Sequence, residues 1–231
     1  MTVVSPRNFR WLAGVALVPM LVASSRSSER AGVLHVRKDV RSSAPRSIVV
    51  FAGGCFWSME RPFDHVPGVI STRVGFEGGN AEHVSYEQVN TGKTGHAESV
   101  EVTYDSTKVS YEKLLDVYWH NIDPFTREAQ FCDHGNEYRT VIFYNGEAQK
   151  QTAEKTRDGF ATKLASFGPI VTQIVPASQF WPAEDYHQHY AAKNPIRYEL
   201  YRVACGRDDR LKKIWGDAAE PYVPSDTVKS K

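Results

Sequence analysis

The sequence predicts an α+β protein, a two-layer sandwich in which helices pack on a mixed β-sheet. Three observations favour this fold class: short apolar or alternating runs typical of strands, segments of helical periodicity between them, and no internal repeats. Some strands alternate rather than being wholly apolar, which is unusual in a purely parallel sheet. The chain of 231 residues, 41% of them hydrophobic, is long enough for one substantial core.

The first 25 residues differ from the rest of the chain. Arg7 and Arg10 precede an apolar run over residues 11–23, and two serines follow. This order is typical of a cleavable export signal. A permanent membrane anchor is the weaker interpretation, because Pro19 interrupts the run and a spanning helix needs roughly 20 apolar residues. We therefore expect a protein exported to the periplasm or cell envelope.

The remaining chain is predicted to contain one domain after a linker. Residues 26–46 have little apolar content and are expected to be a flexible lead-in, whereas residues 47–231 form a single domain with an irregular C-terminal tail. The chain has 28 basic and 27 acidic residues, a net charge of +1. This balance argues against a nucleic-acid partner, and a monomer is the simplest expectation.

The strands are predicted from apolar or alternating runs. Residues 47–52 form an apolar strand that runs out through Gly53 and Gly54, after which a helix can begin behind Cys55. Further strands are expected over residues 69–75, 100–104, 140–144 and 170–175.

Two longer helices are predicted from their capping residues and their periodicity. Ser110 caps a helix that ends near Asn121, with an apolar face made by Tyr111, Leu114, Leu115 and Tyr118. A second helical stretch covers residues 147–167, with Phe160, Leu164 and Phe167 in phase, and Gly168-Pro169 stops it. Beyond residue 175 and the last predicted strand, the chain is predicted to be irregular.

Cys55 is placed where a thiol can react. The two glycines before it allow a tight turn and leave room for a substrate, and the N–H groups of the following helix can stabilise a thiolate. The alternative is a small buried core residue, the usual state of a lone cysteine. The position after a strand and two glycines favours the reactive interpretation.

The three cysteines are Cys55, Cys132 and Cys205, an odd number widely spaced in the chain. A structural disulfide framework normally has an even number at higher density, so these cysteines are expected to cycle between redox states. Ser58 stands where a C-x-x-C motif would have its second cysteine. A resolving thiol must therefore come from a distant part of the chain.

Several motifs occur in one order: Gly54-Cys55-Phe56-Trp57, Gly75-Phe76-Glu77-Gly78-Gly79, Ser85-Tyr86-Glu87-Gln88-Val89, Thr94-Gly95-His96-Ala97-Glu98, Asp133-His134-Gly135-Asn136-Glu137-Tyr138-Arg139 and Ala183-Glu184-Asp185-Tyr186-His187-Gln188-His189-Tyr190. With these motifs the chain resembles the peptide methionine sulfoxide reductase A family over about residues 48–215. The resemblance implies a ferredoxin-like core and an oxidoreductase that needs no cofactor. It also implies reduction of the S epimer of methionine sulfoxide, free or in proteins.

The resemblance also implies roles for individual residues. Cys55 attacks the sulfoxide sulfur and becomes a sulfenic acid, while Glu98 protonates the oxygen. A carboxyl group must sit in an apolar pocket to remain protonated at pH 7. Tyr86 and Tyr138 match the tyrosines that hydrogen-bond the sulfoxide oxygen, and Asp133 matches the aspartate of the hydrogen-bond network. Without the motifs, each of these residues would be a packing, surface or capping residue.

Phe56 and Trp57 are expected to form the apolar wall that holds the S-methyl group, although ordinary core packing explains such rings equally well. Cys205 is the expected resolving thiol, because the family's tails reach the active site, and a thioredoxin-type reductant would then restore the enzyme. Cys132 is the alternative, as a direct attacker or as a relay to Cys205. The chain departs from the common pattern here, with Phe131-Cys132 before the aspartate and no paired cysteines in its tail.

Other chemistries fit parts of the sequence. A thiol peroxidase would use Cys55 against hydroperoxide, and a cysteine hydrolase would pair it with His96, His134 or His187. A metal site would rest on Asp185, His187 and His189, but an H-x-H beside one acid is a weak signal, and no metal is expected. A non-enzymatic binding module would leave Cys55 inert. None of these explains Glu98 and the two tyrosines in family order.

Overall fold

The computed structural model describes residues 45–219. Its central element is a six-stranded mixed sheet with the strand order β7-β6-β1-β3-β2-β8. All neighbouring strands are antiparallel except β6 and β7. The strands are β1 (Arg46–Gly53), β2 (Val69–Glu77), β3 (Ala97–Asp105), β6 (Thr140–Tyr144), β7 (Gln173–Pro176) and β8 (Trp181–Pro182), while β4 (Ala129–Gln130) and β5 (Asp133–His134) form a separate two-stranded sheet.

The helices are α1 (Phe56–Asp64), α2 (Tyr86–Val89), α3 (Tyr111–His120), α4 (Gly146–Lys163), α5 (Tyr190–Lys193), α6 (Pro195–Ala204) and α7 (Arg207–Trp215). Short 3-10 turns cover Asn136–Tyr138 (η1), Ala165–Phe167 (η2) and Gly216–Ala218 (η3). The order β1-α1-β2-β3-α3-β6, with β6, β1, β3 and β2 side by side, is the ferredoxin-like core that the family resemblance implied. The α+β fold class is therefore confirmed.

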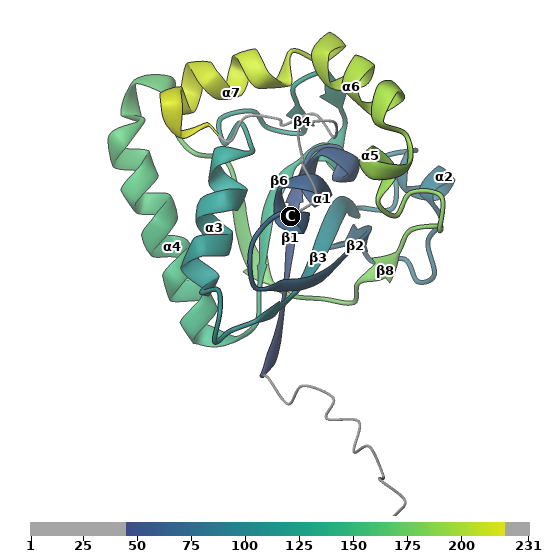
Figure 1. Ribbon diagram of the computed structural model, residues 1–231, viewed down its shortest axis with the longest axis horizontal. Helices are drawn as coiled ribbons and strands as arrows, with labels where there is room; N and C mark the ends of the chain where they lie inside the picture. The colour runs from purple at the N-terminus through teal and green to yellow at the C-terminus, as the bar shows by residue number, and fades with distance from the viewer. Residues whose placement is uncertain (1–44, 220–231) are drawn as a thin grey trace, which may run out of the picture. The chain divides into compact units, whose positions relative to one another are not determined.

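The core lies mainly between one face of the sheet and the helices. Val49 and Phe51 of β1 face α1, α3, α4 and α7, whose apolar side chains complete the cluster. Val50 and Ala52 point to the opposite face, where Phe180 helps to cover them. Because successive strand residues alternate between faces, β1 is apolar on both sides, as expected for a strand in the middle of a sheet. Figure 1 shows α3 and α4 side by side on the helical face.

The expected boundaries agree closely with the structure for most elements. Ser110 caps α3 by accepting a hydrogen bond from the N–H of Lys113, and Cys55 is the N-cap of α1. The stretch expected over residues 147–167 is α4 followed by η2. The predicted signal at residues 1–25 lies outside the described residues, and so does all but the end of the lead-in, whose last residue, Arg46, begins β1. No helix within residues 45–219 is long and apolar enough to cross a membrane.

The expectation of an irregular tail is wrong for residues 195–215, which form α6 and α7. The apolar pattern of α6 is inverted: Ile196, Leu200 and Val203 are 66–76% exposed, while Tyr198 and Arg202 are buried. Ile196, Leu200 and Val203 follow the i, i+4, i+7 spacing of an amphipathic helix, but this apolar stripe marks the exposed face of α6 rather than the face that packs on the protein. Figure 1 shows α6 and α7 across the end of the sheet at which β1 leads into α1.

Candidate active site

Cys55 lies at the junction of β1 and α1. It is a free thiol with 7% of its surface exposed, and its backbone carbonyl accepts the N–H groups of Ser58 and Met59 in the first turn of α1. Gly54 just before it has φ +84°, a conformation that favours glycine. A Cβ at Gly54 would lie 2.5 Å from the Cβ of Gln130. The glycine is therefore needed for the backbone conformation and close packing, rather than to leave space for a substrate.

Burial raises the pKa of the Cys55 thiol far above its usual range, and the charges of Glu98 and Asp133 raise it further. Hydrogen bonds from Tyr201 and from the Trp57 backbone act in the opposite direction but are smaller. The N-terminus of α1 therefore does not by itself make Cys55 a thiolate in this state. Desolvation of the charged form outweighs the helix, so the resting group is a protonated thiol.

Glu98 projects from β3 beside the start of α1. It is 3% exposed, and its Oε2 accepts a hydrogen bond of 2.9 Å from the N–H of Phe56. Burial raises the pKa of Glu98 to about 8, with smaller upward contributions from Asp133 and Glu137. The carboxyl group is therefore largely protonated at neutral pH, as a residue must be if it is to donate a proton in the reaction.

Two phenols lie near this carboxyl group. Burial raises the pKa of Tyr86 to about 12, with smaller upward contributions from Glu98 and Cys55. Burial also raises the pKa of Tyr138, and Glu98 makes the next largest contribution. Tyr86 is held by its N–H, which donates to Glu184, and the Tyr138 hydroxyl donates to Asn90 Oδ1 at 3.3 Å. Both phenols remain neutral hydrogen-bond donors at any physiological pH.

Phe56 and Trp57 form an aromatic cluster behind the thiol. Phe56 is 1% exposed, whereas the half-buried Trp57 stacks on Tyr190 with ring centroids 3.7 Å apart. The indole Nε1 of Trp57 donates to Nδ1 of His187 at 3.1 Å. Packing and binding roles are thus divided, with Phe56 part of the core and Trp57 partly open.

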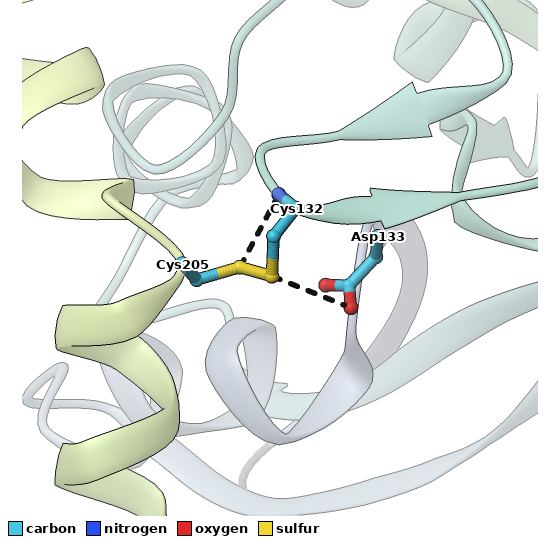
Figure 2. Close-up of side chains that lie close together, drawn as sticks. All are labelled: Cys132, Asp133 and Cys205. Atoms are coloured by element: carbon cyan, nitrogen blue, oxygen red, sulfur yellow. Dashed lines mark hydrogen bonds between the residues drawn. A yellow bond between two sulfur atoms is a disulfide. The ribbon is translucent and has the colours of Figure 1, made fainter.

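Cys132 and Cys205 form a disulfide, with Cα atoms 4.9 Å apart. Figure 2 shows the bridge between the turn before β5 and the end of α6, with the Asp133 carboxylate beside it. Cys132 Sγ lies 3.8 Å from Asp133 Oδ1, and the Cys132 N–H donates to Cys205 Sγ at 3.2 Å. The two distant cysteines are therefore paired with each other, while Cys55 remains free.

Two residues from the unexpected C-terminal helices complete the site. The hydroxyl of Tyr201, on α6, donates to Asp133 Oδ2 and also hydrogen-bonds the Cys55 thiol. Arg207, at the start of α7, is 2% exposed and donates to the backbone carbonyl of Asn121 at 2.6 Å. The one sequence signal for Tyr201 was its spacing of four residues before Cys205, which on a helix gives both residues one face.

The histidines do not lie where a cysteine hydrolase or an H-x-H metal site would need them. No hydrogen bond joins Cys55 to a histidine within residues 45–219, and His187 is bonded to Trp57. His96 is 1% exposed, and neither of its ring nitrogens has a hydrogen-bond partner among the described residues. His189 lies instead beside Glu60 and Asp64, at 3.3 and 3.4 Å. His187 and His189, the H-x-H pair of the alternative metal site, therefore have different partners, and no cysteine–histidine dyad forms among the described residues.

Residues 47–219 match the family model described as peptide methionine sulfoxide reductase. The chain is 44% identical over 171 residues to the peptide methionine sulfoxide reductase MsrA of Bacillus licheniformis, covering 74% of this chain and 94% of that protein. It is 45% identical over 175 residues to MsrA 2 of Caulobacter vibrioides, with 75% and 88% covered.

Solved structures give the same result. Methionine sulfoxide reductase A of Corynebacterium diphtheriae superposes with a TM-score of 0.64 at 36% identity, covering 68% of this chain and 79% of that one. Mxr1 from Saccharomyces cerevisiae in reduced form gives 0.61 at 30% identity, with 66% and 88% covered. With the buried thiol, carboxyl group and phenols in family order, these matches show that the chain belongs to the peptide methionine sulfoxide reductase family.

Proposed function

We propose that this protein is an oxidoreductase that reduces the S epimer of methionine sulfoxide, free or in proteins, to methionine. The observation that carries the proposal is the protonated Glu98 carboxyl group packed beside the Cys55 thiol and two neutral phenols. A sulfoxide presents one polar oxygen and two alkyl arms. The site offers donors for the oxygen and aromatic rings for the alkyl arms.

In the first step, Cys55 Sγ attacks the sulfoxide sulfur while Glu98 gives its proton to the oxygen. Tyr86 and Tyr138 donate hydrogen bonds to that oxygen as negative charge develops on it. Both phenols are neutral, so they donate without adding charge to the site. The hydroxyl proton of Tyr138 leaves Asn90 Oδ1 when it turns to the sulfoxide oxygen. The oxygen then moves from the substrate sulfur to Cys55 Sγ, as an Sγ–O bond forms and both the substrate sulfur–oxygen bond and the new Sγ–sulfur bond break. Methionine leaves, and Cys55 keeps the oxygen as a sulfenic acid.

The Cys132–Cys205 disulfide supports a recycling route that uses both remaining cysteines. One of the two thiols condenses with the Cys55 sulfenic acid, releasing water and forming a disulfide. The other then displaces Cys55, which regenerates the free thiol and leaves the pair Cys132–Cys205 oxidised. A thioredoxin-type dithiol restores the pair. Cys132 is exposed, so an external reductant has access to this bond.

The variant Cys55→Ser tests the assignment, because a hydroxyl is too weak a nucleophile for sulfoxide sulfur. We expect it to form no methionine in a single-turnover assay, while its thermal unfolding midpoint stays close to that of the parent protein. Methionine formation at the parent rate by Cys55→Ser would remove the thiol from the reaction and with it the whole proposal.

We also propose that the protein acts as an exported monomer, with residues 1–25 removed. The support is the order of Arg7, Arg10 and the apolar run over residues 11–23. N-terminal sequencing of protein from the cell envelope tests the export proposal. A start near residues 24–26 is expected, and an intact Met1 would contradict cleavage. Sedimentation of the purified protein tests the oligomeric state.

A further inference from the structure

Tyr201 joins the nucleophile to a carboxylate. Its hydroxyl donates to Asp133 Oδ2 and also contacts the Cys55 thiol. Its ring lies edge-on to Trp57, with centroids 6.3 Å apart and an interplanar angle of 83°. The hydroxyl is therefore located between the attacking sulfur and Asp133, beside the expected substrate wall.

The direction of these hydrogen bonds follows from the donors available. An ionised carboxylate only accepts, so the single phenolic proton of Tyr201 is directed to Asp133. While Cys55 is protonated, its S–H is then the donor toward the Tyr201 oxygen. Once the sulfur is a thiolate, the Tyr201 hydroxyl donates to it, which is the direction that lowers the pKa of Cys55. The result is a continuous chain from Sγ–H through Oη–H to the Asp133 carboxylate.

The charges around the site explain why such a chain is useful. Burial keeps the Cys55 thiol protonated, so the attack needs a base. Burial also raises the pKa of Asp133, although Tyr201, Arg207 and His134 lower it in part. Moving one proton from Cys55 to Asp133 leaves a single negative charge in this pair at every stage. The repulsion between a thiolate and an ionised Asp133 is therefore avoided.

We propose that Tyr201 is a catalytic residue that relays the Cys55 proton to Asp133 as the sulfur attacks, an inference that rests on the proposed function. The S–H bond breaks as a new Oη–H bond forms, and the original Oη–H proton passes to Oδ2. No electrons are transferred in this relay. Glu98 loses one proton to the sulfoxide oxygen and Asp133 gains one, so the net charge of the site is unchanged.

The disulfide fixes both partners of the Tyr201–Asp133 bond. Cys132 directly precedes Asp133, and the N–H of Cys205 donates to the carbonyl of Tyr201 at 2.9 Å within α6. The relay is thus assembled in the state in which Cys55 is free and the other two cysteines are bonded. This state can carry out one reduction and then stop at the sulfenic acid.

The test is a single turnover of the full chain in that disulfide state, with free S-methionine sulfoxide and dimedone to trap the sulfenic acid. We expect Tyr201→Phe to slow methionine formation about 100-fold at pH 7, a typical loss for a proton-transfer group, with the half-saturating sulfoxide concentration unchanged. The loss shrinks as pH rises, because hydroxide then removes the thiol proton directly. Tyr144→Phe, at the end of β6, is the matched control and keeps the parent rate.

A double-variant comparison separates a relay from two independent effects. Asp133→Asn is expected to match Tyr201→Phe, and the double variant is expected to be no slower than either, because both break one chain. Parent-like speed in Tyr201→Phe, or losses that multiply in the double variant, would overturn the relay. If Tyr201→Phe does not fold, a fluorinated tyrosine at position 201 keeps the ring and the hydroxyl. It must shift the pH midpoint of Cys55 alkylation, and an unchanged midpoint overturns the proposal.

The same assay distinguishes failure of the relay from failure of the proposed function. A parent protein that forms no methionine and no dimedone adduct contradicts sulfoxide reduction itself. A parent protein that forms one methionine per chain, beside an equally fast Tyr201→Phe, contradicts only the relay.

Discussion

The thiol of Cys55 and the carboxyl group of Glu98 both have raised pKa values, and the consequences of the two shifts are opposite. For Glu98, burial produces the protonated acid that the reaction needs at neutral pH. For Cys55, burial produces the protonated thiol that the reaction must deprotonate. The same apolar environment therefore keeps Glu98 protonated, as an acid must be, and keeps Cys55 protonated and unreactive until a base removes its proton. This inactive thiol is also less exposed to unwanted oxidation, because the thiolate is the reactive form.

Glu98→Gln removes the transferable proton but keeps a neutral side chain of similar size. We expect methionine formation to slow about 100-fold at pH 7 with little change in substrate binding. Since the pKa of Glu98 is about 8, its acid form is present below that pH and is lost as the pH rises through it. The parent rate should therefore carry a fall centred near pH 8 that the variant lacks.

The measurement is the single-turnover rate between pH 6 and pH 9.5. Glu101→Gln is the control, since it lies on the same strand and is paired with Arg73 at 2.9 Å near the surface. An equal pH profile in the parent and in Glu98→Gln would show that another group supplies the proton.

Among the elements, the junction between β1 and α1 depends on a glycine. Gly54 has a positive φ, and an added Cβ would meet the Cβ of Gln130 at 2.5 Å. We expect Gly54→Ala to lower the free energy of unfolding by about 2 kcal/mol or more, from backbone strain and overpacking. Gly159→Ala is the control, because an added Cβ in the middle of α4 has no neighbour within 4 Å.

Denaturant unfolding measures both variants. Gly159→Ala should raise stability by about 0.5–1 kcal/mol, since alanine is the better helix former. If both variants changed the free energy of unfolding by the same amount and in the same direction, the turn would not require glycine at position 54.

The sequence was informative where apolar residues mark the buried side of an element. The bounds of β1, α3 and β6 were predicted closely because their apolar residues and caps follow the ordinary pattern. In α6 the buried face carries Tyr198 and Arg202 and the exposed face carries Leu200, so the apolar periodicity marks the face opposite to the one that packs on the protein. Tyr201 and Arg207 were missed because their helices were not expected.

Across the whole molecule, the site draws on parts of the chain that only the fold brings together. Family order located Cys55, Glu98, Tyr86 and Tyr138, because each lies in a local motif. The sequence raised a Cys132 relay to Cys205 as one alternative but could not select it, since a spacing of 73 residues does not say how close two cysteines lie in the fold. The structure adds that pairing and places Tyr201 of α6 beside Asp133 and the Cys55 thiol.

The recycling route is a property of the whole chain, because it requires three distant cysteines to exchange one disulfide. The most direct measurement starts with fully reduced protein, adds one equivalent of S-methionine sulfoxide per chain, and maps all three cysteines under non-reducing conditions. One methionine per chain, a Cys132–Cys205 disulfide and a free Cys55 thiol are the predicted result. No methionine with three unmodified thiols would contradict the account.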